Sequence, residues 1–311
     1  MEQLEGRVAV ITGGSSGIGR GIALACLEAG MTVYVTGRSP EHLEDTVRDA
    51  TGRGFEVRAL QVDVTDLPAM LAAAARVQEE AGGVDLLVNN AGIGLTGPVS
   101  AATPADWDWL IDVNIKGVGH GLHAFLPLLR REKPGRSGAH IVNTSSMAGL
   151  MPIVAGLYSM TKAAVIALSE ALHIELAPEG IGVSAYCPGP THSNIAAAVA
   201  RRPEGYGPSG YDRPDPAHLR AAARQPYMSA EEAGQRVLAG VRRGDLFILT
   251  HPEFRDGVVD RHRTIEEAFP DEPLHAERAA AIPFLTSSPV YAPDHRLPPP
   301  VHPGPTAHAA P

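Results

Sequence analysis

The sequence predicts a doubly wound α/β fold, with a parallel sheet of about seven strands and helices on both faces. Apolar runs typical of buried strands alternate with segments of helical period over most of the chain. Residues 7–38 read as strand, glycine-rich turn, helix and strand, and such a crossover joins parallel strands. At 311 residues, the chain is long enough to bury one large core.

The elements follow from these patterns in chain order. Apolar runs predict strands at 8–11, 33–35, 55–64, 84–88, 140–144, 181–187 and 246–250. Helical periods predict helices at 22–29, 40–50, 66–81, 104–131, 157–176, 217–224 and 230–243. We expect a break around Gly117–Gly121 in the fourth of these helices.

Two stretches lack a clean period. Residues 190–229 hold many Pro, Gly, Arg and Tyr residues, and we expect a substrate lid or binding loop there. Residues 287–311 form a Pro-rich tail, either disordered or lying as an extended arm on a partner subunit. We therefore predict one domain over 1–286, followed by this tail.

Composition narrows the function classes. The formal charge of −9 argues against nucleic acid or an anionic membrane as a partner. No stretch approaches a membrane span, and nothing at the N-terminus is typical of a signal peptide, so a cytoplasmic location is expected. Two cysteines and scattered histidines predict no metal site, and we interpret His192 and His251 as polar surface or cleft residues. Arg201 and Arg202 are interpreted as a solvated pair, and the alternative is an anion clamp.

The glycine-rich turn, residues 12–19, lies where the first strand becomes a helix. Backbone N–H groups at a helix start can face a pyrophosphate, which predicts a nucleotide site. The alternative is a tight turn of the kind found in any α/β protein.

A second pattern is the pair Tyr158 and Lys162, which share one helix face. An ammonium group near a phenol lowers the phenol pKa and makes it a usable proton donor or acceptor. Ser145 and Ser146 directly follow a predicted strand, so they should meet this helix at the carboxyl edge of the sheet.

Taken together, these residues make the chain similar to the short-chain dehydrogenase/reductase family, whose fold is the doubly wound Rossmann sheet. The motifs that carry the resemblance occur in the family's order: TGGSSGIG at 12–19, NNAG at 89–92, DVN at 112–114, SS at 145–146, YSMTK at 158–162 and CPG at 187–189. Residues 190–229 and 248–254 resemble a subgroup that includes bacterial dehydrogenases of lignin-derived aryl ethers.

The resemblance implies a role for each matching residue. Tyr158 would be the general acid in reduction or the base in oxidation, and Lys162 would lower its pKa and bind the nicotinamide ribose. Ser146, the second serine of the pair, would hydrogen-bond the substrate oxygen, and Asn114 would hold a water that links Lys162 to solvent. The implied cofactor contacts, besides Tyr158 and Lys162, are Gly13, Ser15, Ser16, Gly17, Ile18, Gly19, Arg38, Asp63, Val64, Asn90, Ala91, Gly92, Pro188, Gly189, Thr191 and Ser193.

The end of the second strand indicates which dinucleotide binds. A carboxylate there would bond the ribose 2′-hydroxyl of NAD(H), but this sequence has Thr36-Gly37-Arg38. Arg38 could pair with a 2′-phosphate, so we predict NADP(H) rather than NAD(H). The alternative is that Arg38 is a solvated surface charge.

We therefore predict an NADP(H)-dependent enzyme that interconverts a secondary alcohol and a ketone. Tyr206, Tyr211 and Tyr227 either contact a bulky apolar or aromatic substrate or pin the 190–229 segment to the body. The alternatives are a non-catalytic NADP(H)-binding sensor or scaffold, or an epimerase or imine reductase on the same scaffold. The resemblance also implies a homodimer or homotetramer, paired through helices 106–131 and 157–176.

Overall fold

The structure is a computed structural model that describes residues 1, 3–131, 138–152, 155–288, 290 and 291. It divides into two compact units, residues 1–265 and 266–311. The first unit holds the sheet and all the predicted site residues. The tail predicted over 287–311 lies outside the described residues, apart from 287, 288, 290 and 291.

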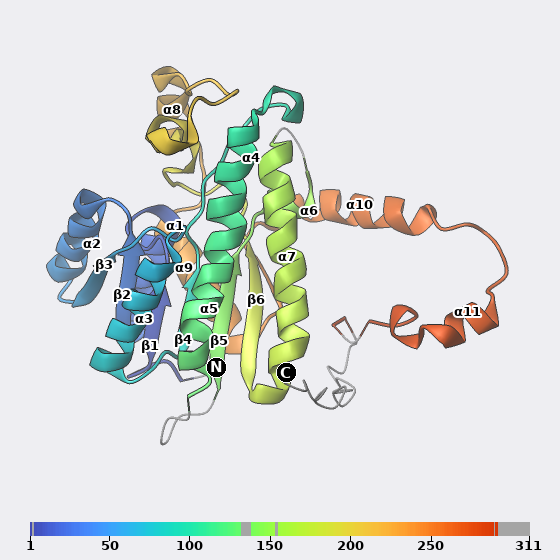
Figure 1. Ribbon diagram of the computed structural model, residues 1–311, viewed down its shortest axis with the longest axis horizontal. Helices are drawn as coiled ribbons and strands as arrows, with labels where there is room; N and C mark the ends of the chain where they lie inside the picture. The colour runs from blue at the N-terminus through green and yellow to red at the C-terminus, as the bar shows by residue number, and fades with distance from the viewer. Residues whose placement is uncertain (2, 132–137, 153–154, 289, 292–311) are drawn as a thin grey trace, which may run out of the picture. The chain divides into compact units, whose positions relative to one another are not determined.

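Within the described residues, the sheet has seven parallel strands in the order β3-β2-β1-β4-β5-β6-β7, which confirms the predicted fold class (Figure 1). In register, Ala9 lies between Val33 of β2 and Leu86 of β4. The strands are β1 (Val8–Ile11), β2 (Thr32–Gly37), β3 (Val57–Gln61), β4 (Leu86–Asn89), β5 (Ala139–Thr144), β6 (Ile181–Cys187) and β7 (Phe247–Leu249).

Helices cover both faces because successive side chains of each buried strand point to opposite sides. In β1, Val10 belongs to the core under α3, α5 and α7, whereas Ile11 belongs to the core under α1, α2 and α9. The helices are α1 (Gly17–Glu28), α2 (Pro40–Gly52), α3 (Leu67–Ala81), α4 (Pro104–Ile111), α5 (Gly117–Leu129), α6 (Met147–Leu150), α7 (Gly156–Leu176), α8 (Pro216–Ala223), α9 (Ala230–Arg243), α10 (Arg255–Glu267) and α11 (Ala276–Ala281).

The break predicted at Gly117–Gly121 is wrong by one turn. The irregularity is a π-helical turn, η2 (Asp112–Lys116), and α5 is continuous from Gly117. A Cβ on Gly117 would lie 2.7 Å from Val64 Cγ2, and one on Gly121 would lie 2.0 Å from Asn89 Oδ1. These glycines therefore allow α5 to pack closely on the sheet, and they do not break the helix.

The strand order reverses at β1, which has β2 on one side and β4 on the other. Ligands of open α/β sheets bind beyond the carboxyl ends of the strands at such a switch point. The glycine-rich turn follows β1, and Asn90 follows β4, so both lie at this edge. In the described part of the chain, no helix has the length and apolar character needed to cross a membrane.

Candidate active site

The glycine-rich turn after β1 has no room for larger residues. A Cβ on Gly13, whose φ is +64°, would lie 2.8 Å from Ala91 Cα. A Cβ on Gly19 would lie 2.4 Å from both Asn90 Nδ2 and Gly13 O. Among the described residues, Ser16 at the start of α1 makes no side-chain cap to that helix. The first N–H groups of α1 are therefore left for a phosphate.

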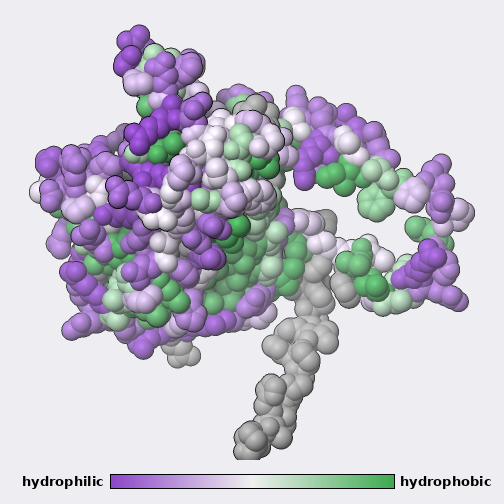
Figure 2. Space-filling view, turned by 45° about the horizontal axis from the view of Figure 1, so that its top comes forward, coloured by the Kyte–Doolittle hydropathy of each residue, from purple (hydrophilic) through white to green (hydrophobic). Residues whose placement is uncertain are grey.

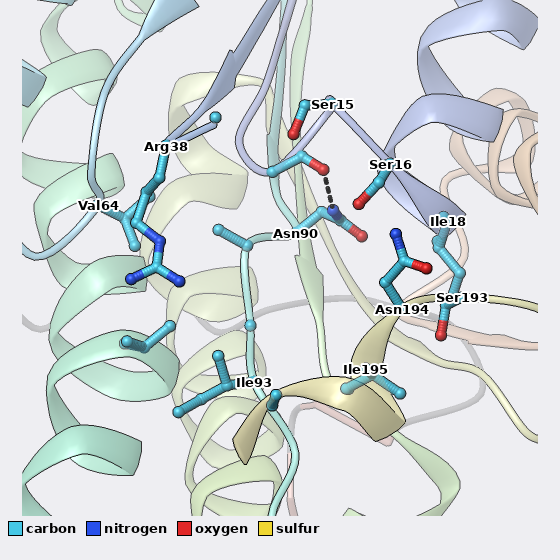
Figure 3. A pocket seen from close by; sticks show the side chains of 18 of the residues that line it. Ser15, Ser16, Ile18, Arg38, Val64, Asn90, Ile93, Ser193, Asn194 and Ile195 are labelled. Atoms are coloured by element: carbon cyan, nitrogen blue, oxygen red, sulfur yellow. Dashed lines mark hydrogen bonds between the residues drawn. The ribbon is translucent and has the colours of Figure 1, made fainter. Parts of the chain in front are cut away.

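This turn forms one wall of a cavity of about 580 Å³. In Figure 3, Arg38 and Val64 lie on one side of this cavity, and Ile18, Ser193 and Asn194 lie on the other. The cavity brings together most of the predicted cofactor residues: Gly13, Ser15, Ser16, Gly17, Ile18, Gly19, Arg38, Asp63, Val64, Asn90, Ala91, Gly92, Tyr158, Lys162, Pro188 and Ser193. Its lining combines the glycine-rich turn with residues that follow β2, β3, β4 and β6.

Arg38 lies at the end of this cavity next to β2 and β3. Its Nη1 is 3.7 Å from Asp63 Oδ2, and the Arg38 side chain keeps 40% of its surface exposed. Arg201 lines the same cavity, and its pKa is lowered by burial and by the nearby charge of Arg38. Two guanidinium groups thus share this end with one carboxylate.

Arg202 corrects the prediction of a solvated pair. Its side chain is 7% exposed, and its Nη1 donates to Asp106 Oδ1 at 2.7 Å. The guanidinium also lies 5.0 Å from the ring centre of Trp109 and 6.0 Å from that of Tyr206. Arg202 is buried because α4 supplies both the opposite charge and an aromatic surface.

Tyr158 and Lys162 lie in the first turns of α7, as predicted from their spacing. Lys162 is buried, its Nζ donates to Thr144 O at 2.8 Å, and it lies 5.7 Å from the Tyr158 ring centre. Burial lowers the pKa of Lys162 to about 8.

Burial, rather than the neighbouring Lys162, dominates the pKa of Tyr158 in this structure. Burial raises the pKa of Tyr158 to about 12, and the hydrogen bond with Ser146 offsets only part of that increase. Lys162 is itself desolvated and lies over the ring face, while its ammonium group bonds the Thr144 carbonyl. Tyr158 is therefore a protonated phenol at neutral pH.

The two serines after β5 face different surroundings. Ser145 is buried, and its Oγ donates to Lys162 O at 2.7 Å. Ser146 lines a second cavity beside Tyr158, and its Oγ accepts from Ala148 N at 3.1 Å. Ser146 is thus the serine placed to meet a ligand in the second cavity.

Asn114 lies in the π-helical turn η2 and is fully buried. Its Nδ2 donates to Ile93 O and to Thr161 Oγ1, each at 3.0 Å, and its Oδ1 accepts from Ile93 N at 2.9 Å. The cavity walls formed by the described residues do not include it. However, Asn114 Oδ1 and Lys162 Nζ each lie 3.3 Å from the position that a Cβ on Gly92 would take. The two groups therefore face one small space.

The second cavity, of about 950 Å³, adjoins the first, and Tyr158 and Pro188 line both. Gly189 and Thr191, predicted cofactor residues, line this second cavity. Apolar or aromatic residues that line the second cavity include Leu95, Met147, Leu219, Ala222, Ala223 and Tyr227. Figure 2 shows the α8 segment projecting from the body with a mostly hydrophilic exterior.

The three tyrosines of the 190–229 segment divide between the two predicted roles. Tyr206 Oη donates to Asp112 Oδ2 at 2.9 Å, and Tyr211 Oη donates to Pro98 O at 3.2 Å, so both pin the segment to the body. Tyr227 lines the second cavity.

Several lining residues of the first cavity escaped the sequence reasoning. Thr36 lies two residues before Arg38, and its place near the end of β2 could have identified it. Asn194, Ile195, Ala198 and Arg201 lie in the predicted binding loop, but with no clean period the sequence did not indicate which of its residues line the cavity. The remaining missed residues include Ser39, His42, Val62, Ile93, Val113, Thr144 and Pro203.

Comparisons with known proteins agree with this geometry. The family model for short chain dehydrogenases matches residues 7–204. C alpha-dehydrogenase of Sphingobium sp. strain SYK-6 is 36% identical over 268 residues, which cover 85% of this chain and 87% of that protein.

Two solved structures are similar over almost their whole length. A short chain dehydrogenase/reductase from Burkholderia phymatum in complex with NAD has a TM-score of 0.77 and 33% identity, covering 88% of this chain and all of that chain. A short-chain dehydrogenase from Sphingobium yanoikuyae in complex with NADPH has a TM-score of 0.65 and 27% identity, covering 86% of this chain and 98% of that chain.

Proposed function

Because the chain belongs to the short-chain dehydrogenase family, we propose that it is an NADP(H)-dependent oxidoreductase that interconverts a secondary alcohol and a ketone. One observation carries the proposal: Tyr158 lines both cavities, with Lys162 beside it in the first and Ser146 beside it in the second. A proton donor at the junction of the cavity lined by the glycine-rich turn and a larger cavity with apolar walls suits carbonyl reduction.

A nicotinamide dinucleotide fits the first cavity. The N–H groups at the start of α1 would hold the pyrophosphate, and Gly13 and Gly19 leave the space for its approach. Asp63 and Val64 would flank the adenine, Asn90 to Gly92 would pass beside its ribose, and Lys162 would bind the nicotinamide ribose. When bound, the nicotinamide supplies or takes up the hydride.

The chain's own groups handle the proton. In reduction, the Tyr158 hydroxyl donates its proton to the substrate carbonyl oxygen, while the Ser146 hydroxyl hydrogen-bonds the same oxygen. Burial raises the pKa of Tyr158, so the phenol is protonated at neutral pH and has a proton to donate. We assign proton resupply to the small space shared by Lys162 Nζ and Asn114 Oδ1, which a water would bridge.

The preference for NADP(H) rests on Arg38 and Arg201, which share the adenosine end of the cavity. The negative charge of a 2′-phosphate there would offset the repulsion between the two guanidinium groups. The phosphate would also compete with Asp63 for Arg38. One of the two similar structures is a complex with NAD and the other a complex with NADPH, so the proposed preference rests on this chain's own residues.

The second cavity supports a bulky apolar or aromatic substrate. Leu95, Leu219 and Tyr227 give it apolar walls, and its volume of about 950 Å³ exceeds that of the cofactor cavity. The relative from Sphingobium is named as a C alpha-dehydrogenase, which fits oxidation at a secondary carbinol carbon.

A homodimer or homotetramer is part of the proposal. Ala163, Ala167 and Ala171 follow one exposed side of α7, where a second helix can approach closely. Figure 2 shows hydrophobic residues over the α5 and α7 side of the surface. Light scattering should give a mass of two or four chains, and a monomer at micromolar concentration would contradict this part.

The test is a panel of aryl ketones and aryl carbinols, assayed with NADPH, NADH and their oxidised forms. We expect turnover with at least one bulky aryl pair and a higher kcat/KM for NADPH than for NADH. Arg38→Ala should lower kcat/KM for NADPH about 10- to 100-fold, the worth of a charge-assisted contact, with little change for NADH. Tight NADPH binding without turnover on any member would favour a sensor, and equal use of NADH would refute the cofactor assignment.

A further inference from the structure

His251 follows β7 and makes two hydrogen bonds to the loop that follows β6. Gly189 N donates to His251 Nδ1 at 3.1 Å, and His251 Nε2 lies 3.1 Å from Pro190 O. A backbone N–H can only donate and a carbonyl can only accept, so Nδ1 is unprotonated and Nε2 carries the proton. Thr250 Oγ1 lies 2.9 Å from the same Nδ1. His251 thus acts as a neutral imidazole that bonds two consecutive residues of this loop.

Packing fixes the imidazole in place. The ring stacks on Phe254, with centres 5.7 Å apart and planes 25° apart, and Phe254 packs against the core around Met147. A Cβ on Gly189 would lie 2.7 Å from both His251 Cγ and Phe254 Cε2. The two rings therefore fill the space next to Gly189, and the loop packs against them.

The loop bonded by His251 forms part of the wall that the two cavities share. Pro188 lines both cavities and is buried, while Gly189 and Pro190 line the second. Pro188 O accepts from Met147 N at 2.9 Å, and Met147 directly follows Ser146. The loop is therefore bound by His251 and by the segment that carries Ser146, and Pro190 O also accepts from Met228 N at 3.2 Å.

We propose that His251 is a positioning residue that fixes the Gly189–Pro190 backbone, and so holds the reacting end of the cofactor against the substrate cavity. The inference rests on the proposed function, because it places a hydride donor at that junction. His251 is not among the described residues that line either cavity, so it acts through the loop and touches no reacting atom.

Two substitutions separate the bonds from the packing. His251→Phe keeps an aromatic ring against Phe254 but leaves the Gly189 N–H without its acceptor, whereas Pro190 O keeps Met228 N as a donor at 3.2 Å. His251→Asn retains an acceptor near the Nδ1 position but cannot reach Pro190 O. The matched control is His262→Phe, because His262 is an exposed residue of α10.

The test measures the affinity of each variant for NADPH and for 2′,5′-ADP, which lacks the nicotinamide half, by fluorescence and by calorimetry. For His251→Phe we expect the Kd for NADPH to rise about tenfold, the cost of an unsatisfied backbone donor, with the Kd for 2′,5′-ADP unchanged. His251→Asn should lie between wild type and His251→Phe, and His262→Phe should match wild type. A lower kcat for His251→Phe and faster amide exchange at Gly189 should accompany the loss.

Three results would overturn the inference. They are an unchanged Kd for NADPH in His251→Phe, an equal loss for NADPH and 2′,5′-ADP, and unchanged exchange at Gly189. If the wild type prefers NADH, the same comparison is made with NADH and ADP. In that case the NADP(H) assignment fails. The change in the Kd for NADH, relative to the change in the Kd for ADP, still decides the role of His251. A wild-type protein that binds no dinucleotide would refute the proposed function itself.

Discussion

Asp106 holds the 190–229 segment to α4, and its removal should release that segment. Asp106 is fully buried, and its Oδ1 accepts from Arg202 Nη1 at 2.7 Å and from Ser209 Oγ at 2.8 Å. Its Oδ2 accepts from the backbone N–H groups of Thr103 and Gly210, each at 2.9 Å. Burial alone would raise the pKa of Asp106, but these hydrogen bonds hold it below its ordinary value.

The substitution Asp106→Asn keeps the shape of the side chain but removes its charge. It leaves the Arg202 guanidinium, 7% exposed, without its counter-charge. It also replaces one of the two acceptor oxygens with an NH₂ group that faces other donors. Removing one partner of a buried ion pair costs about 3–5 kcal/mol, and that is the loss we expect. Since the 190–229 segment contributes Ile195 and Arg201 to the first cavity, NADPH affinity should fall as well.

Two assays measure this loss. Urea unfolding reports the global free energy, and limited trypsin cleavage between Arg201 and Arg202 reports local release of the segment, because Pro203 blocks cleavage after Arg202. The control is Asp108→Asn, which makes the same change on an exposed residue of α4 and should cost no more than about 0.5 kcal/mol. If the two variants show the same stability and the same cleavage rate, the ion pair does not hold the segment, and the reasoning is refuted.

Two further predictions concern the cofactor cavity. Gly19→Ala should abolish NADPH binding in a fluorescence titration, because its Cβ would lie 2.4 Å from Asn90 Nδ2. Gly52→Ala, at a position with no atom within 4 Å of the added Cβ, should bind normally, and normal binding by both would contradict the prediction. Lys162 has its pKa lowered by burial from 10.5 to about 8, so the unfolded chain binds more protons between these values and stability should rise with pH across them. Lys162→Met should flatten this part of the stability–pH curve in urea unfolding, and an equally steep curve would show that Lys162 does not cause the rise.

Patterns local in sequence predicted the sheet and the main site residues well. The short apolar runs around Val10 and Val88 could only be strands buried on both faces, and the structure confirms both. Parallel strands present their carboxyl ends at one edge, so residues after β1, β4 and β5 had to meet there. The rule therefore predicted that Gly13, Asn90 and Ser146 lie at the same edge of the sheet, although none of their contacts was known.

Features that depend on distant partners were not predictable. Arg202 looked solvated in sequence because its partner, Asp106, lies 96 residues away. His251 and Gly189 are 62 residues apart, and neither has a local signal for the bond between them. The effect of burial on the pKa of Tyr158 was also not predictable, because the spacing to Lys162 shows a neighbouring charge but not the burial of both groups.

The central claim is that Tyr158 gives the proton at the junction of the two cavities. The most direct measurement compares Tyr158→Phe with wild type in single-turnover reduction of an active aryl ketone, with the Kd for NADPH measured on the same samples. We predict a Kd within about threefold of wild type and a rate lower by about 10²- to 10⁴-fold, the usual worth of a general acid. A variant that binds NADPH normally and reduces the ketone at near the wild-type rate would contradict the claim.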